Sequence, residues 1–263
     1  MYWLNGEAVD AQTLELAIDD PGLLFGATVF TTLRVYESSL DHRLTGWKQH
    51  CDRIRTSLET FHWAQPDWER LRRGAEVLRG HYPVLRITLF PDGRELITGR
   101  HLPADLALRQ NQGVTAWEAS PAYGRTLPEH KTGNYLACWL AAQAAKTQGA
   151  AEAILVDEAG NWLETSTGTL WGWAQGQWWT PPLAVGILPG VVRSQLLAHL
   201  NHQRYPVQES QFTSSQVQQF ECLAYTNSVV ELVPIHTVLR GRIRLEYNPN
   251  CKALQALWSY WTL

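Results

Sequence analysis

The sequence lacks the features of several large classes of protein. Its apolar runs are far shorter than the roughly 18 residues that a membrane span requires, and residues 1–7 lack the basic start and apolar core of a signal peptide. It also has no basic stripe or long charge run, and its net charge is −3. We therefore expect a cytoplasmic protein with neither a membrane nor a nucleic acid as partner.

Metal and redox motifs are missing as well. None of the four cysteines stands at metal or redox spacing, so we expect reduced cysteines: Cys51, Cys138, Cys222 and Cys251. His199 and His202 lie three residues apart without an evident third ligand, so no metal is expected. There is no P-loop, GxGxxG, GxSxG or HExxH, which leaves out the common nucleotide, hydrolase and metalloprotease motifs.

What is present indicates a folded α+β protein. The chain has 263 residues, of which 45% are apolar, enough for a large core in one large domain or two. Residues 29–36 favour a strand. Residues 45–61 predict a helix with one apolar face and Thr45 as N-cap, and Pro66 should open a second helix. Hairpins are expected around residues 5–6 and 91–93.

The pattern changes near residue 100, where few strand-forming residues occur. We predict an N-terminal α+β domain over 1–110, a linker over 111–125 and a strand-rich C-terminal domain over 126–263. Within the latter, several of the 13 tryptophans lie between Trp171 and Trp179. Such a run could line a ligand pocket or a subunit contact, but we favour a hairpin packed into the core.

Lys131 stands out because it lies in a polar, glycine-containing turn just before an alanine-rich helix, residues 134–148. A lone loop lysine is usually a surface residue, so its context decides. Glu164 ends a buried-type strand, where a carboxylate is costly without a cationic partner. Pyridoxal phosphate (PLP) needs both groups, a lysine for the Schiff base and a carboxylate at the pyridine nitrogen.

Three further segments could bind the phosphate of that cofactor. Arg53 flanks the apolar face of the predicted 45–61 helix. The glycine loop 186–190 leads into a helix whose first N–H groups, from Val191 and Val192, would point at an anion. Tyr225 to Ser228 forms the third segment, with Asn227 and the Ser228 hydroxyl as further polar groups.

Taken in order, these motifs resemble those of the fold-type IV PLP enzymes, the class IV aminotransferase family. The matching segments are His50-x-x-Arg53, Lys131-x-x-Asn134-Tyr135, Glu164, 186–193 and 225–228, and the resemblance covers about residues 2–235. It implies a two-domain fold like that of D-amino-acid aminotransferase and a homodimer. It also implies PLP as cofactor, bound by Lys131, Tyr135, Arg53, Glu164, Val191, Val192, Asn227 and Ser228.

The substrate is inferred from the segment Phe30-Thr31-Thr32-x-Arg34-Val35, which resembles the corresponding segment of the aminodeoxychorismate lyases of this family. That resemblance implies conversion of 4-amino-4-deoxychorismate into 4-aminobenzoate and pyruvate for folate synthesis. Because a strand alternates sides, Thr31 and Thr32 cannot both face the cofactor, and we assign Thr32 with Lys131 to catalysis. Arg34 and Arg94 are the candidate partners of the substrate carboxylates.

Two other functions stay open at this point. The first is an aminotransferase for branched-chain or D-amino acids, which would use the same cofactor residues. The second is a PLP-binding relative without turnover, because the chain departs from the family pattern at Ala27, Thr28, Thr169 and Val192.

Overall fold

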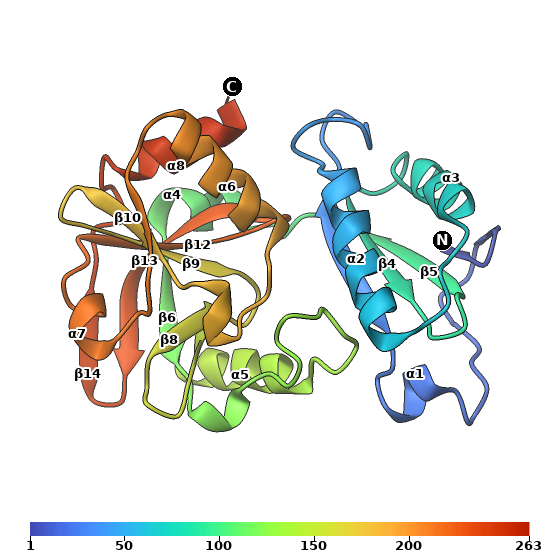
Figure 1. Ribbon diagram of the computed structural model, residues 1–263, viewed down its shortest axis with the longest axis horizontal. Coiled ribbons are helices and arrows are strands. Elements are labelled where there is room, and N and C mark those ends of the chain that lie inside the picture. Colours follow the sequence, from blue (N-terminus) through green and yellow to red (C-terminus); the bar gives the residue numbers. More distant parts are fainter. Residues whose placement is uncertain (263) are drawn as a thin grey trace. The chain divides into compact units, whose positions relative to one another are not determined.

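The structure, a computed structural model, describes residues 1–262. The chain forms two compact units. The first comprises Met1–Pro103 together with His130–Asn134, and the second comprises Ala104–Glu129 and the chain from Tyr135 onward (Figure 1). Both contain helices and strands, so the predicted mixed α+β class is confirmed.

The first unit is built on a five-stranded antiparallel sheet with the strand order β2-β1-β5-β4-β3. Both predicted hairpins are present. The first turns at Asn5 and Gly6, whose φ angles of 47° and 102° fit a primed turn. The strands are β1 (Tyr2–Leu4), β2 (Glu7–Val9), β3 (Val29–Arg34), β4 (Val84–Leu89) and β5 (Glu95–Arg100).

Two helices cover one face of this sheet, and a short third helix, α1 (Pro21–Leu24), precedes β3. The apolar face predicted for α2 (Trp47–Phe61) is buried at Cys51, Ile54 and Leu58. Helix α3 (Trp68–Leu78) buries Leu71, Ala75 and Leu78. These side chains pack against Val29 and Leu33 of β3 and the alternate residues of β4, which form the core of the unit.

The predicted starts of both helices are wrong by one or two residues. Gly46, not Thr45, is the N-cap of α2. The Thr45 hydroxyl instead donates to the Ser39 carbonyl at 2.8 Å, because it closes the preceding loop. Pro66 lies before α3 rather than in it, and Asp67 caps that helix by accepting from two backbone N–H groups.

A short segment from the middle of the chain extends the sheet beyond β3. Thr132 forms an antiparallel bridge with Val29. The Phe30 N–H donates to the Lys131 carbonyl at 2.8 Å, and the Gly133 N–H donates to the Thr28 carbonyl at 2.7 Å. Residues 130–134 thus belong to the first unit, although the residues on both sides of them belong to the second.

The second unit is built on a nine-stranded mixed sheet, with β11-β10-β9-β12-β13-β6-β7-β8 in order and β14 paired to β13. Its strands are β6 (Val114–Glu118), β7 (Glu152–Val156), β8 (Trp162–Thr165), β9 (Thr169–Ala174), β10 (Gln177–Thr180), β11 (Val207–Glu209), β12 (Cys222–Asn227), β13 (Glu231–Arg240) and β14 (Ile243–Glu246).

The predicted linker over 111–125 is contradicted by this sheet. Strand β6 lies inside that range and pairs in parallel with β13 on one side and β7 on the other. Helix α4 (Leu106–Gln112) precedes it. The five residues of β6 give a weak pattern on their own, and their strand conformation depends on partners distant in sequence.

The helices of the second unit bury small and aromatic side chains on this sheet. Helix α5 (Leu136–Thr147) packs Cys138, Ala141 and Ala145 over β7. Helices α6 (Val191–His202) and α8 (Leu254–Thr262) cover Trp171 and Trp178, which are fully buried, so the core interpretation of the tryptophan run is confirmed. The short helices are η1 (Pro121–Tyr123), η2 (Leu183–Val185) and α7 (Ser214–Val217). Over residues 1–262, no helix combines the length and apolarity needed to cross a membrane.

A buried ion pair provides a test of the first unit. The Glu95 carboxylate is fully buried and accepts from the Arg70 guanidinium at 2.8 and 3.1 Å and from Trp3 Nε1 at 3.2 Å. Glu95→Ala should lower the free energy of unfolding by about 2–3 kcal/mol, because it leaves these donors without an acceptor. Urea unfolding measures this. Lys48→Ala, which removes an exposed ion pair with Asp52, should cost less than about 0.5 kcal/mol, and an equal effect would contradict the prediction.

Candidate functional site

Lys131 lies against an aromatic ring of the first unit. Its Nζ is 4.5 Å from the centroid of the Phe30 ring, and the guanidinium carbon of Arg86 is 3.6 Å from the same centroid. Phe30 is only 4% exposed. Two cationic groups therefore contact one buried ring, an arrangement that cation–π attraction stabilises.

The alternation of β3 sets which predicted residues share this face. Val29 and Leu33 point into the core beneath the helices, so Phe30, Thr32 and Arg34 point the other way. Thr32 pairs directly with Arg86 of β4. The catalytic candidates Lys131 and Thr32 are thus on one face of the sheet, together with the substrate-binding candidate Arg34.

Sequence reasoning missed Arg86, although a signal for it exists. In β4 the buried residues Leu85, Ile87 and Leu89 alternate with the others, so Arg86 must stand on the face opposite the core. A single arginine at such a position, beside the strand that carries Thr32, marks that face as cationic.

Arg94, the other substrate-binding candidate, is held elsewhere. It donates to Asp20 and to Asp92, each at 2.6 Å, and its guanidinium carbon lies 4.5 Å from the Phe90 ring centroid. The hydrogen bond from Arg94 lowers the pKa of the buried Asp20 carboxyl. The Nε and Nη2 groups of Arg94 are therefore engaged by two aspartates.

The residue before Lys131 attaches this segment to α2. The Nδ1 atom of His130 lies 2.9 Å from the Ser57 hydroxyl, and its ring packs on Phe61 at 4.6 Å. One turn earlier on α2, Arg53 donates from Nη2 to the Thr31 hydroxyl at 2.8 Å. The predicted Schiff-base lysine and the predicted phosphate arginine are therefore both linked to the same helix and strand.

Glu164 is the predicted partner of the pyridine nitrogen and lies in the second unit. It is 6% exposed, and its Oε1 accepts from Arg125 Nη1 at 2.6 Å. Its Oε2 accepts from the backbone N–H of Leu188 at 3.2 Å. Arg125 also donates to the Pro128 carbonyl at 2.7 Å, and its guanidinium carbon lies 5.2 Å from the Tyr135 ring centroid. The buried carboxylate thus has a cationic partner and a backbone donor.

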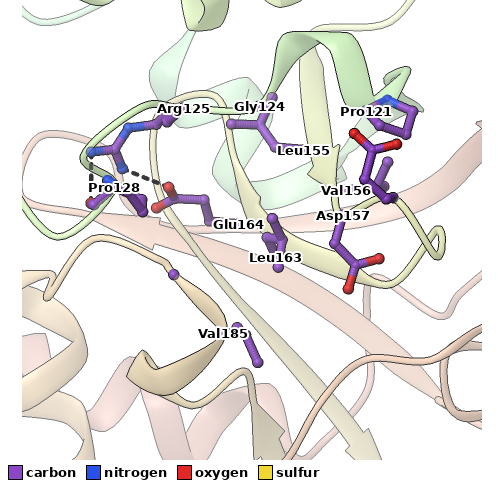
Figure 2. A pocket seen from close by; sticks show the side chains of 12 residues that line it. Pro121, Gly124, Arg125, Pro128, Leu155, Val156, Asp157, Leu163, Glu164 and Val185 are labelled. Carbon is purple, nitrogen blue, oxygen red and sulfur yellow. Dashed lines mark hydrogen bonds and ion pairs between the residues drawn. The ribbon is translucent and has the colours of Figure 1, made fainter.

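A pocket of about 250 Å³ lies beside this pair. Figure 2 shows Arg125 and Glu164 next to each other on its wall, linked by a hydrogen bond, with Pro128 beside the Arg125 guanidinium. Leu155, Leu163 and Val185 supply apolar lining. Arg125 was not identified from the sequence, because nothing in its local pattern distinguishes it from a surface arginine.

The predicted phosphate loop leads into α6 as expected. Gly190 is the N-cap, and no side chain caps this helix, so the N–H groups of Val191 and Val192 are not taken by a capping side chain. A Cβ atom at Gly190 would lie 3.0 Å from the Thr169 hydroxyl, so a side chain there would crowd the loop. Glu164, through its contact with Leu188, lies at the same end of the unit.

Asn227 belongs to the third predicted phosphate segment, residues 225–228, and binds the loop that carries Thr167. Its Nδ2 donates to the Thr167 carbonyl at 3.2 Å, and its Oδ1 accepts from the N–H groups of Val229 and Val230, both at 2.9 Å. Both ends of the side chain thus bind backbone, which fixes the turn that presents Ser228. A direct contact of Asn227 or Ser228 with the cofactor stays a prediction.

Comparison with known proteins gives the family. A profile described as "Amino-transferase class IV" matches residues 28–238. The chain belongs to this family. Its members are PLP-dependent, so the predicted cofactor and the predicted class of enzyme are confirmed at the level of the family.

Relatives with two different activities are similarly close. An aminodeoxychorismate lyase of Vibrio harveyi is 22% identical, covering 94% of each chain. A putative branched-chain-amino-acid aminotransferase of Methanocaldococcus jannaschii is 28% identical, covering 92% of this chain and 88% of the other. The crystal structure of the Escherichia coli branched-chain aminotransferase aligns with a TM-score of 0.84 at 22% identity, covering 100% and 93% of the two chains. This similarity confirms the predicted fold.

The donors in each unit fit PLP. The second unit offers a buried carboxylate for a protonated ring nitrogen and an uncapped helix N-terminus for a phosphate. The first unit offers Lys131 and the Arg53 guanidinium. Each unit thus carries groups whose charges suit one part of the cofactor.

The fit of Gly133 against β3 provides a test of how Lys131 is positioned. A Cβ atom at Gly133 would lie 2.3 Å from the Thr28 hydroxyl and 2.6 Å from the Gly26 carbonyl oxygen. Gly133→Ala should therefore displace residues 131–133 and weaken PLP binding at least tenfold (about 1.4 kcal/mol) in a titration of the apoprotein. At Gly80 a Cβ would meet nothing closer than 3.5 Å, so Gly80→Ala is the control. Equal affinities would show that this pairing does not position the lysine.

Glu152 lies beneath the loop that carries Thr167, and burial raises the pKa of its carboxyl above the ordinary 4.5. It accepts hydrogen bonds from Ser166 and Thr167. Since the folded protein then binds the proton more tightly than the unfolded chain, this group destabilises the fold as pH rises above 4.5.

Glu152→Gln should therefore gain stability relative to the natural protein as pH rises from 4.5 to 8, because the amide does not ionise. Urea unfolding at several pH values measures the difference. Glu59→Gln, at an exposed position on α2, should show a difference that is much less dependent on pH. A stability difference between Glu152→Gln and the natural protein that does not change with pH would sink the prediction.

Proposed function

We propose that this protein is a PLP-dependent 4-amino-4-deoxychorismate lyase, which releases 4-aminobenzoate and pyruvate for folate biosynthesis. The observation that carries the proposal is the face of the first sheet that bears Lys131, because Thr32, Arg34 and Arg86 stand on it as well. The similarity to the Vibrio harveyi lyase over nearly the whole chain supports it.

This face suits a substrate with two carboxylates. Arg34 and Arg86 would each bind one, and Arg86 replaces Arg94 in this role because Arg94 is engaged by two aspartates. The Arg34 guanidinium carbon lies 4.8 Å from the Tyr36 ring centroid, and Arg86 lies on Phe30, so both guanidinium planes are oriented by aromatic rings.

PLP, when bound, would supply an electron sink for the electrons released when the C4 proton of the substrate is removed. Lys131 Nζ would accept the C4 proton as general base. The bond between C3 and the ether oxygen then breaks, and the ring becomes aromatic. The Thr32 hydroxyl or Lys131 would return a proton to the leaving enolpyruvate, which becomes pyruvate. Glu164 would hold the pyridine nitrogen in its protonated state, and Arg53, Val191, Val192 and Ser228 would hold the phosphate.

The alternative is an aminotransferase for branched-chain or D-amino acids. The similarity to branched-chain aminotransferases in both sequence and fold supports it. Lys131, Glu164 and the phosphate donors would act alike in both enzymes, so only the substrate separates them.

The substrates themselves provide the test. The holoenzyme should release 4-aminobenzoate and pyruvate from 4-amino-4-deoxychorismate, both detected by chromatography, because Lys131 and Thr32 handle the two protons of the elimination. Lys131→Ala should abolish this release and also the covalent attachment of cofactor that mass spectrometry detects after borohydride reduction.

Two other results would redirect the assignment. Amino-group transfer from branched-chain or D-amino acids to 2-oxoglutarate, without release of 4-aminobenzoate, would replace the lyase by the aminotransferase. Covalent attachment that persists in Lys131→Ala would show that another lysine holds the cofactor.

We further propose that the enzyme acts in the cytoplasm as a homodimer. The family resemblance supports this, and so does an apolar stripe on α5, where Leu136, Trp139 and Leu140 are 61%, 58% and 41% exposed at helical spacing. Sedimentation equilibrium measures the oligomeric state.

A further inference from the structure

Three side chains of the first unit form a buried polar chain next to the Lys131 segment. Thr31 is 0% exposed and points from β3 toward α2. Its hydroxyl oxygen lies 2.6 Å from Nδ1 of His50, which is 1% exposed, and 2.8 Å from Nη2 of Arg53. His50 and Arg53 lie one turn apart on α2, so strand and helix are joined by this chain.

The donors and acceptors in this chain of hydrogen bonds can be assigned. A guanidinium carries only donors, so the Thr31 oxygen must accept from Arg53. The hydroxyl has one proton, and the other atom within hydrogen-bond distance is Nδ1 of His50. If Thr31 donates there, Nδ1 is an acceptor and His50 is neutral, with its proton on Nε2. If Nδ1 of His50 donated to Thr31 instead, the Thr31 proton would be buried without an acceptor, which is unfavourable.

The surroundings of His50 agree with a neutral ring. Burial lowers the pKa of His50 well below its ordinary value, and the positive charges of Arg53 and Lys131 lower it further. These two cations are the charged groups that act on it. Thr31 and a neutral His50 carry no charge, so neither of them cancels the charge of Arg53.

We infer that Thr31 and His50 are positioning residues that orient Arg53 toward the phosphate of the cofactor. The inference rests on the proposed site in one respect, that Arg53 binds the phosphate. Thr31 would then contribute to cofactor binding. Its neighbour Thr32 lies on the opposite face of β3 and would act on the substrate.

Binding of two probes to the apoprotein tests this role. PLP and pyridoxal differ only in the phosphate, and quenching of tryptophan fluorescence reports the binding of both. Thr31→Val and His50→Gln should each weaken PLP binding about tenfold and leave pyridoxal binding within about twofold, because only the phosphate contact is disturbed. Thr31→Ser keeps the hydroxyl and should keep the preference for PLP.

Controls separate this inference from the site on which it rests. Arg53→Ala should reduce the preference for PLP at least as much as Thr31→Val does, and Thr56→Val, on the exposed side of α2, should retain the full preference. If Arg53→Ala reduces the preference while Thr31→Val and His50→Gln keep it, the positioning role is overturned and the cofactor site stands. If Arg53→Ala also keeps it, the phosphate role of Arg53 is wrong and the inference falls with it.

A second measurement does not depend on the stability of any variant. The ¹⁵N shifts of His50 in the natural apoprotein at pH 7 should show a neutral ring protonated at Nε2. A neutral ring protonated at Nδ1, or a doubly protonated ring, would overturn the hydrogen-bond chain itself.

Discussion

The pairing of residues 131–133 with the edge of β3 is the contact on which the position of Lys131 depends. Two backbone hydrogen bonds and the Val29–Thr132 bridge make this segment an additional edge of the sheet. A loop lysine would otherwise sample many positions. Strand β3 then uses its two faces differently. Phe30 contacts Lys131 on one side, and Thr31 contacts Arg53, the proposed phosphate ligand, on the other. A shift of this strand by one residue would exchange the two faces and lose both contacts.

The second unit surrounds a buried carboxylate with hydrogen-bond donors. Glu164 has Arg125 as a counter-ion and the Leu188 N–H as a further donor. The same loop continues into the N-terminus of α6, whose dipole favours an anion. The Leu188 N–H, which binds Glu164, thus lies three residues before the first N–H group of α6.

Much of this could be predicted from local pattern. The two hairpins of the first unit follow from turn chemistry, and the apolar face of α2 follows from periodicity. The site residues rest on a family resemblance and stay predictions. Two helix starts were wrong by one or two residues for local reasons, but the larger failures depended on partners distant in sequence. Strand β6 is held by β13, more than a hundred residues later, so its own five residues predict little. The contacts of Arg86 and Thr31 could not be predicted from the sequence, because they depend on how β3, β4 and α2 pack together.

The placement of residues 130–134 in the first unit has a consequence for how the chain is made. A ribosome completes the five strands of that unit by residue 100, yet the outer edge of β3 then still lacks its partner. An open edge of this kind can pair with another chain. About thirty more residues, including the whole of β6, must emerge before Thr132 can close it. The short segment that carries Lys131, the proposed cofactor lysine, is therefore also the segment that covers the open edge of β3.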